Sequence, residues 1–200
     1  MAFVYTPEGT GPATEDDPLF HDAPADFAAI VNAVESCELA TLEAPGLDGV
    51  VLRYGFFYGP GTVYARGGSF AEDVARRRVP IVGDGGGVFS FVHVNDAAAA
   101  TVSALKRGAA GVYNIVDDEP ATVREWLPRY AELLGARRPF KVPRFMGRLG
   151  GGSYAVYLMT QQRGASNAKA REQLGWQPRY ASWRDGFHAE LATPAPMRDT

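Results

Sequence analysis

The chain has 200 residues, of which 46% are hydrophobic and 22% charged, and its formal net charge at pH 7 is -3. This size and composition are typical of one ordinary soluble domain with a substantial core. The weak negative charge argues against a nucleic-acid surface, which needs clustered Lys and Arg. Cys37 is the single cysteine, so an intrachain disulfide and a cysteine-based zinc cluster are excluded.

The start of the chain has no basic segment followed by an apolar run, and no stretch reaches the roughly 20 apolar residues that span a bilayer. We therefore expect a cytoplasmic protein with no membrane partner, no nucleic-acid partner and no metal.

Strand-like apolar segments alternate with helical periods, which is the pattern of an α/β layer architecture. Residues 3–5, 50–54 and 111–116 are predicted to be strands that lie side by side in that order, mostly parallel. A helix is predicted between the first two strands, with Asp26 as its cap. Its apolar residues recur at helical spacing: Phe27, Ile30, Val31 and Val34.

Three further helices are predicted, each with a candidate cap at its start. The first follows Asn95 and Asp96, the second starts near Thr122 with Glu125 completing a capping box, and the third is capped by Ser166. The glycine run 83–87 precedes a strand pattern, which indicates a turn.

The stretch 139–164 lies outside the regular alternation and is predicted to form a lid or a small second lobe. The predicted organisation is an α/β core over residues 1–138, with an insertion near 62–92, and a C-terminal substrate lobe and tail over 139–200.

Four segments, in the right order, carry a resemblance to a known family: LRYGFFYGPGT (52–62), FSFVHVNDAAAA (89–100), GVYNIVDDEP (111–120) and SNAKAREQLGW (166–176). They resemble extended short-chain dehydrogenases/reductases of the NAD-dependent epimerase/dehydratase type, over nearly the whole chain to about Phe187. The resemblance implies a truncated Rossmann-like parallel sheet with helices on both faces, a small C-terminal substrate lobe, and NAD(P) as the cofactor.

The segment after residues 50–54 leaves the carboxyl edge of the predicted sheet, where open α/β folds bind ligands. Tyr54, Gly55, Phe56 and Tyr58 are therefore pocket candidates. The resemblance implies that Tyr54, Gly55 and Phe56 lie near the nicotinamide. An equally weighted alternative is that Phe56 and Phe57 are core aromatics.

Five residues are candidate proton carriers: Tyr54, Tyr58, His93, Asp16 and His21. His93 precedes a helix start, which favours a structural role over a catalytic one. Asp16 lies in an acidic loop between a strand and a helix, where catalytic residues accumulate, although such loops are more often solvated turns.

The sequence departs from the family pattern in its chemistry. No strand, glycine-rich turn and helix are present to receive a pyrophosphate. The family's serine position falls at about Met1, and its tyrosine and lysine positions fall on Phe27 and Val31, which cannot donate a proton or bind a ribose. The arginine with which relatives hold sugar-nucleotide phosphate is replaced at Phe89 or Ser90. We therefore expect weak or absent NAD(P) binding and a small, partly apolar substrate.

Three functions stay open. The chain could belong to an NAD(P)-linked redox or epimerase system whose cofactor half is lost or supplied by another polypeptide. It could be a cofactor-independent isomerase, cyclase or dehydratase that uses the inherited pocket, or a non-catalytic partner protein.

The resemblance also bears on assembly. In the family fold the strand matching residues 3–5 is interior, so missing neighbours would leave an open edge. We expect a homodimer, or a complex with a partner that covers the edge, in which Phe3, Tyr5, Phe27 and Ile30 are protected.

Overall fold

The computed structural model describes residues 1–192; the last eight residues of the predicted tail, 193–200, lie outside the described part. The helices are α1 (Ala25–Leu42), α2 (Ser69–Ala75), α3 (Val94–Arg107), α4 (Val123–Leu133), α5 (Arg144–Thr160), α6 (Ala168–Leu174) and α7 (Trp183–Leu191). The strands are β1 (Val50–Tyr54), β2 (Phe56–Tyr58), β3 (Ile81–Val82), β4 (Val88–Phe89), β5 (Phe91–His93), β6 (Gly111–Ile115), β7 (Ala121–Thr122) and β8 (Lys141–Val142). The α/β class is confirmed.

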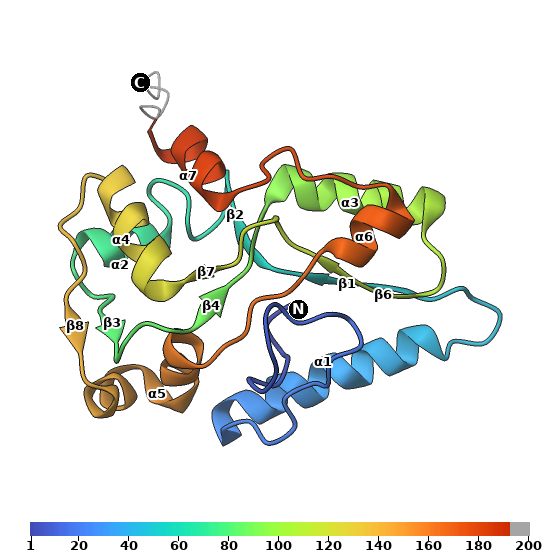
Figure 1. The fold of residues 1–200 in the computed structure, drawn as a ribbon, viewed down its shortest axis with the longest axis horizontal. Coiled ribbons are helices and arrows are strands. Elements are labelled where there is room, and N and C mark those ends of the chain that lie inside the picture. Colours follow the sequence, from blue (N-terminus) through green and yellow to red (C-terminus); the bar gives the residue numbers. More distant parts are fainter. Residues whose placement is uncertain (193–200) are drawn as a thin grey trace.

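The longest strands, β1 and β6, pair in parallel with Val50 opposite Gly111 and Tyr54 opposite Ile115. Helix α1 lies on one side of this pair, and α3 and α6 lie on the other (Figure 1). Side chains alternate along β1 accordingly, because Arg53 bonds to α1 while Leu52 packs against the α3 and α6 side. Helices on both faces were predicted, and this is confirmed.

The sheet is less continuous than predicted. Within residues 1–192 the strands form four separate pairs, of which β1–β6, β2–β5 and β3–β8 are parallel and β4–β7 is antiparallel. The predicted parallel pairing of 50–54 with 111–116 is confirmed, but the predicted third strand of this sheet, residues 3–5, is wrong.

Residues 3–5 are not a sheet strand, although they lie beside β1. The Ala2 N–H donates to the Tyr54 carbonyl at 2.8 Å, and Tyr5 forms only an isolated antiparallel bridge with Leu19. The reason is local: the following loop folds back, and its Phe20 N–H donates to the Val4 carbonyl at 2.8 Å. The chain thus covers part of the edge that was expected to be open.

Gly55 marks a change of partner between β1 and β2. Its N–H donates to the Ile115 carbonyl at 3.1 Å, whereas the next N–H, of Phe56, donates to the Ser90 carbonyl at 2.9 Å. A side chain at position 55 would collide with that Ser90 carbonyl, so the close approach requires glycine. This shift brings the ends of β2 and β5 together beyond the β1–β6 pair.

Two predicted helix caps are wrong. Helix α3 is capped by His93, whose Nδ1 accepts the Asn95 N–H at 3.1 Å. The Asp96 carboxylate instead accepts the backbone N–H groups of Arg179 and Tyr180, at 2.8 and 3.1 Å. Asn95 and Asp96 thus lie two and three residues beyond the residue that caps the helix, because the strand ends on a histidine whose ring is the acceptor.

The other predicted caps had mixed outcomes. Asp26 does not cap α1; its carboxylate accepts the Tyr154 N–H at 2.9 Å. The capping box at Thr122 is absent, because Glu125 pairs with Arg184. Ser166 accepts the Ala168 N–H at 3.3 Å, but the cap position of α6 is Asn167, whose side chain makes no capping hydrogen bond.

The glycine run 83–87 is the predicted turn. Its Gly85 and Gly87 carbonyls accept the first amides of α4, those of Arg124 and Val123, at 3.0 and 2.9 Å. The N-terminus of α4 is therefore occupied by this turn.

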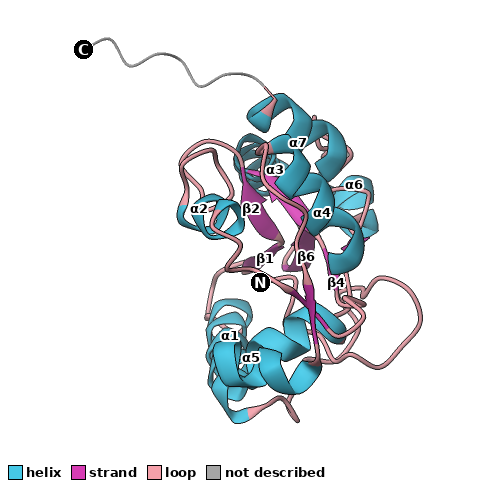
Figure 2. Cartoon of the chain, turned by 90° about the vertical axis from the view of Figure 1, so that its left-hand side faces the viewer, coloured by secondary structure: helices cyan, strands magenta, loops and turns pink. Residues whose placement is uncertain are grey.

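The stretch 139–164 is more regular than expected, since it forms β8 and the long helix α5. Helix α5 is kinked at Gly152, which has φ 77° and ψ 178°. The part after the kink packs beside α1 (Figure 2), where the Tyr154 and Tyr157 rings lie 4.5 and 5.4 Å from the Phe27 ring. Phe27 is fully buried there.

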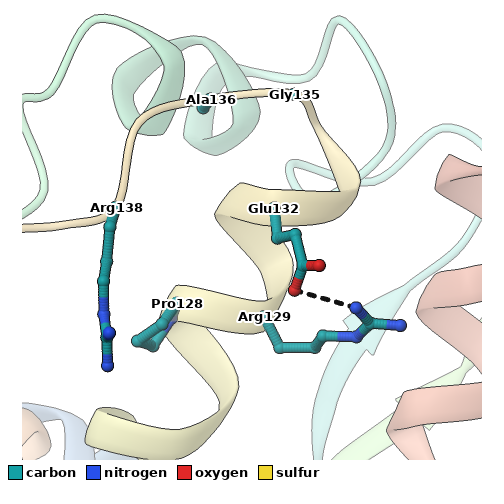
Figure 3. A pocket seen from close by; sticks show the side chains of 6 residues that line it. All are labelled: Pro128, Arg129, Glu132, Gly135, Ala136 and Arg138. Carbon is teal, nitrogen blue, oxygen red and sulfur yellow. Dashed lines mark hydrogen bonds and ion pairs between the residues drawn. The ribbon is translucent and has the colours of Figure 1, made fainter.

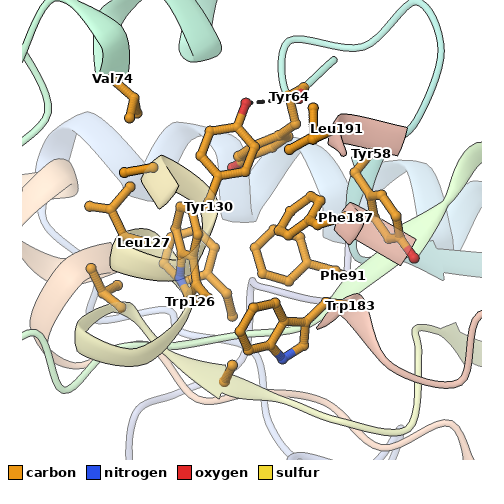
Figure 4. Packing of buried hydrophobic residues seen from close by; sticks show 14 of the residues in the cluster. Tyr58, Tyr64, Val74, Phe91, Trp126, Leu127, Tyr130, Trp183, Phe187 and Leu191 are labelled. Carbon is orange, nitrogen blue, oxygen red and sulfur yellow. Dashed lines mark hydrogen bonds between the residues drawn. The ribbon is translucent and has the colours of Figure 1, made fainter. Parts of the chain in front are cut away.

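The largest buried cluster is aromatic and lies between β2, β5, α4 and α7 (Figure 4). Phe91 is at its centre, with the Trp126 and Phe187 rings 5.2 and 5.1 Å away. Helix α7 is thereby held against the carboxyl ends of β2 and β5, which positions the side chains described next.

Candidate functional site

A cavity of about 680 Å³ opens where β1 passes into β2. It is lined by Met1, Phe3, Leu52, Tyr54, Gly55, Phe56, Phe57, Gly61, Thr62, Val63 and Tyr64. Its walls are mostly aromatic and aliphatic, and no ionisable side chain other than tyrosine lies among them. Such a cavity suits a small, flat and partly apolar molecule.

Three of the predicted site residues, Tyr54, Gly55 and Phe56, line this cavity. The Tyr54 hydroxyl is 2.5 Å from the Thr101 hydroxyl oxygen, so it is anchored to α3. The Phe56 ring stacks between the Phe3 and Phe89 rings, with centroids 4.7 and 4.3 Å away. Phe56 is thus both a wall of the cavity and a part of the aromatic packing; its role toward a cofactor stays a prediction.

The glycine turn after β2 completes the cavity and was not predicted to do so. Thr62, Val63 and Tyr64 lie in this turn, and Val63 is 50% exposed. The sequence did indicate a chain reversal here, because Gly59, Pro60 and Gly61 follow directly after the end of β2. The direction of that return depends on packing of Tyr64 against Trp126, which the sequence does not specify.

Tyr58 lies outside the cavity, buried under α7. Its hydroxyl has no hydrogen-bond partner among the described residues. Burial, reinforced by the charge of Asp117, raises the pKa of Tyr58. A proton donor needs access to its substrate, and this hydroxyl lies against Gly186 of α7 instead.

His93 is also buried and has both ring nitrogens engaged. Nδ1 accepts the Asn95 N–H, and Nε2 lies 3.1 Å from Glu190 Oε1. Since Nδ1 is an acceptor here, the proton sits on Nε2 and points to Glu190. This geometry gives His93 a positioning task between α3 and α7, in line with the structural role that the sequence favoured.

Asp16 and His21 are exposed and do not meet the other candidates. His21 Nε2 lies 3.5 Å from Glu35 Oε1 on α1. Neither residue lines the cavity beside Tyr54. The acidic loop instead supports the fold, because Glu15 accepts the Asn114 N–H at 2.6 Å and Asp17 binds Arg163 at 2.9 Å.

Asp117 is a buried carboxyl that sequence reasoning missed. It follows β6 and is 2% exposed, with Oδ1 accepting the Glu119 N–H at 3.2 Å and Oδ2 lacking a hydrogen-bond partner among the described residues. Burial raises the pKa of Asp117 well above its ordinary value. The signal was the acidic run directly after the buried strand GVYNI.

Beneath α1 lies a buried ion pair. Arg53 donates to Glu38 through Nε at 2.9 Å and through Nη2 at 2.6 Å, and its Nη1 donates to the Tyr5 hydroxyl at 2.7 Å. Tyr5 in turn donates to Asn114 at 2.7 Å. Every strong hydrogen-bonding group of this network has a partner, so it ties α1, β1 and β6 together and leaves no open site.

A second hollow, of about 590 Å³, lies at the C-terminal end of α4 (Figure 3). Three charged residues line it, of which Arg129 and Glu132 pair with each other at 2.8 Å and Arg138 is the third. None of the predicted site residues lies there.

The residues present can be compared with the needs of NAD(P). Phe3, Tyr54 and Phe56 offer a flat apolar wall for a ring. A pyrophosphate needs free amides at a helix N-terminus after a strand. Helices α3 and α4 begin directly after strands. However, α3 is capped by His93, and the first amides of α4 donate to carbonyls of the turn 83–87. The starts of α3 and α4 therefore do not offer the set of free amides that a pyrophosphate needs.

Over residues 1–192 no group of three or more His, Cys, Asp or Glu side chains is arranged to hold a metal ion. The described helices also include none with the length and apolarity needed to cross a bilayer.

Comparison with known proteins gives a family match. A model of the NAD dependent epimerase/dehydratase family matches residues 3–116. A 3-diazoavenalumate denitrifying reductase from Streptomyces sp is 44% identical over 191 residues, which are 95% of this chain and 62% of that protein. A UDP-glucose 4-epimerase from Rhizobium leguminosarum bv. trifolii is 37% identical over 101 residues, 48% of this chain and 28% of that protein.

Solved structures agree on the fold. Human epimerase family protein SDR39U1 with NADPH has a TM-score of 0.74 at 23% identity, over 94% of this chain and 62% of that one. DesIV, a dTDP-glucose 4,6-dehydratase from Streptomyces venezuelae with NAD and TYD bound, has a TM-score of 0.70 at 24% identity, over 95% and 56%. The chain thus spans about three fifths of the length of these relatives.

Proposed function

Since this chain belongs to the NAD-dependent epimerase/dehydratase family, we propose that it is the substrate-side part of a reductase that acts on a small, partly apolar molecule. The observation that carries the proposal is the cavity beside Tyr54 and Phe56, whose lining is aromatic and aliphatic. A ligand with a flat apolar body gains the most from such walls.

The choice of a small substrate over a sugar nucleotide rests on the residues before β5. Phe89 and Ser90, which take the place of the phosphate-binding arginine of relatives, are both buried. Phe89 stacks on Phe56, and the Ser90 hydroxyl accepts the Ala165 N–H at 2.8 Å. Neither side chain offers the cation with which an arginine would bind a diphosphate in a bidentate way.

The choice of a reductase over an epimerase rests on the relative that matches nearly the whole chain, whose name is that of a reductase. We propose NAD(P) as the reductant, with its ring against the Tyr54 to Phe56 wall. Its pyrophosphate would bind to residues that this chain does not contain, as expected if a further polypeptide supplies the glycine-rich turn.

The cofactor-independent alternative lacks a comparable observation. An isomerase or dehydratase needs an acid or base within hydrogen-bond reach of its substrate. The candidates Asp16, His21 and His93 lie outside the cavity, and the Tyr54 hydroxyl that lines it is bonded to Thr101.

Ligand binding to the purified chain tests the proposal. We expect acetophenone, a small flat carbonyl compound, to bind more tightly than UDP-glucose by calorimetry or NMR titration. Val63→Asp, which places a charge at the mouth of the cavity, should weaken acetophenone binding by roughly tenfold, since it replaces apolar contact with a solvated carboxylate. Val102→Asp on α3 is the matched control, because Val102 is 49% exposed and Val63 is 50% exposed. Tighter binding of UDP-glucose, or equal effects of the two variants, would refute the proposal.

A further inference from the structure

The chain carries no acidic residue between Glu132 and Glu172. Eight cationic residues lie in this interval, although the whole chain has a net charge of -3. Five of them fall within residues 137–148 and all five are exposed: Arg137, Arg138, Lys141, Arg144 and Arg148. They lie on β8, on the first half of α5 and on the segment just before them, at one end of the molecule (Figure 1).

The protein does not neutralise this charge itself. Among the described residues, Arg137, Arg138, Lys141 and Arg148 form no ion pair, and Arg144 reaches Asp84 only at 3.9 Å. Cations that lack a carboxylate partner are free to bind an external anion.

Apolar side chains project from the same segment. Phe145 is 67% exposed and Leu149 is 86% exposed, and their spacing of four residues puts them on one face of α5. The opposite face rests on the protein, because a Cβ at Gly147 would lie only 2.6 Å from Val82 Cγ1. Phe145 and Leu149 therefore point away from the body of the protein, each directly after an arginine.

Two further apolar side chains of this region are partly exposed. Phe140 is 42% and Met146 is 49% exposed, and both line a hollow beside Val82, next to the face that carries Phe145 and Leu149. We define the basic apolar edge as these residues: Arg137, Arg138, Phe140, Lys141, Arg144, Phe145, Met146, Arg148 and Leu149.

We propose that the basic apolar edge binds the surface of an anionic lipid bilayer, with Phe145 and Leu149 in the interfacial layer and the cations on the headgroups. Protruding aromatic and aliphatic side chains flanked by arginine are the features of a peripheral interfacial helix. Arginine suits this place because its stem can lie along apolar surface while its head stays hydrated.

A folded protein partner fits the edge less well. A stable protein interface engages about 20 to 30 residues on each side, and the edge offers nine residues of which four are apolar. The expectation of no membrane partner rested on the lack of a spanning segment. That none of the described helices could cross a bilayer does not bear on the proposal, because surface contact needs only a short insertion.

Cosedimentation with vesicles tests the inference. We expect the chain to bind vesicles of phosphatidylcholine and phosphatidylglycerol at least about tenfold more tightly than vesicles of phosphatidylcholine alone, and to lose this binding as salt is raised. Phe145→Ser with Leu149→Ser should abolish the insertion. Arg144→Gln with Arg148→Gln should reduce binding to the anionic vesicles alone.

Matched controls come from the end of α3, where Leu105 is 84% exposed and basic residues follow it. Leu105→Ser and Lys106→Gln with Arg107→Gln should bind vesicles as the unmodified chain does, and circular dichroism should show that every variant keeps its fold. Equal binding to both vesicle types, no binding at low salt, or loss of binding in the α3 variants would overturn the proposal. So would self-association that disappears in the Phe145→Ser, Leu149→Ser variant, because a second copy would then cover the edge.

Discussion

The side chain of Tyr58 lies against the backbone of Gly186, so that α7 can approach the end of β2 only because residue 186 has no side chain. The Tyr58 ring also packs edge-on against Phe187, with centroids 4.8 Å apart. Helix α7 is thus seated by one glycine and one aromatic residue in adjacent positions.

We expect Gly186→Ala to lower the free energy of unfolding by about 1–3 kcal/mol, because the added methyl group collides with the Tyr58 hydroxyl and the ring atoms next to it. Tyr58→Phe alone should be nearly neutral, since the buried hydroxyl has no hydrogen-bond partner among the described residues. The double variant should recover part of the loss. Urea unfolding of the four proteins measures the coupling, and simple additivity would contradict the packing described here.

His93→Ala is expected to destabilise the protein by roughly 2–4 kcal/mol, because it removes the cap of α3, breaks the contact with Glu190 and leaves a cavity. His188→Ala on the exposed side of α7 is the control and should change stability by less than about 0.5 kcal/mol. Equal effects in chemical unfolding would show that His93 does not join α3 to α7.

Asp117 makes stability depend on pH. A carboxyl whose folded-state pKa is raised binds more protons in the folded than in the unfolded state, so its stabilising effect is complete below the unfolded pKa and is lost as pH rises through the folded pKa. From about pH 4 upward, the contribution of Asp117 should therefore decrease.

Asp117→Asn tests this, since it keeps the oxygen that accepts the Glu119 N–H but cannot ionise. We expect the variant to be more stable than the parent at pH 8, by roughly 1–3 kcal/mol, and to differ less at pH 5. Asp16→Asn, at an exposed position, should show no such pattern. A variant less stable than the parent at pH 8 would mean that the ionised carboxylate is needed.

The elements that could be predicted are those with a strong local pattern. The four-residue repeat at Phe27 and Val31 predicted α1, and the apolar run VVLRY predicted β1. The helical repeat reflects burial of one face, which a sequence records directly. The expected full burial of VVLRY is wrong, because only Arg53 of this strand is buried. The position of Tyr54 at a strand end likewise predicted that it lines a cavity.

What could not be predicted depends on partners distant in sequence. Strands β3 and β8 have two residues each, and they exist only because they pair across some sixty positions. Helix α5 contains a run of glycines that disfavours helix and is kinked at Gly152, while Gly147 in its first half allows close packing on Val82. Asp16 and His21 were grouped with the site because the path of their loop is not encoded in its composition.

The affinity for NADH and NADPH depends on the free amides that the helix N-termini offer to a pyrophosphate. We expect the isolated chain to bind NADH and NADPH weakly or not at all, because the N-termini of α3 and α4 are engaged by His93 and by the glycine turn. Fluorescence titration measures this directly. Submicromolar binding of either nucleotide would mean that another set of amides receives the pyrophosphate.

The last prediction concerns self-association. Of the four residues expected at an interface, only two are accessible. Tyr5 and Phe27 were expected at an interface, but both are buried within the chain, at 1% and 0% exposure. Phe3 and Ile30 are partly exposed and remain candidates for an interface that covers apolar surface.

We expect light scattering at tens of micromolar to give a mass above the 21.5 kDa of one chain, and Phe3→Lys or Ile30→Glu to lower it, because a charge at an apolar contact must be desolvated when the contact forms. Leu105→Lys on α3 is the control, since the Leu105 side chain is 84% exposed and α3 lies on the opposite side of β1 from α1. A parent chain of monomer mass, unchanged in both variants, would mean that the loop that bonds to Val4 covers the edge completely. Loss of mass in the Leu105→Lys variant alone would instead place the contact on α3.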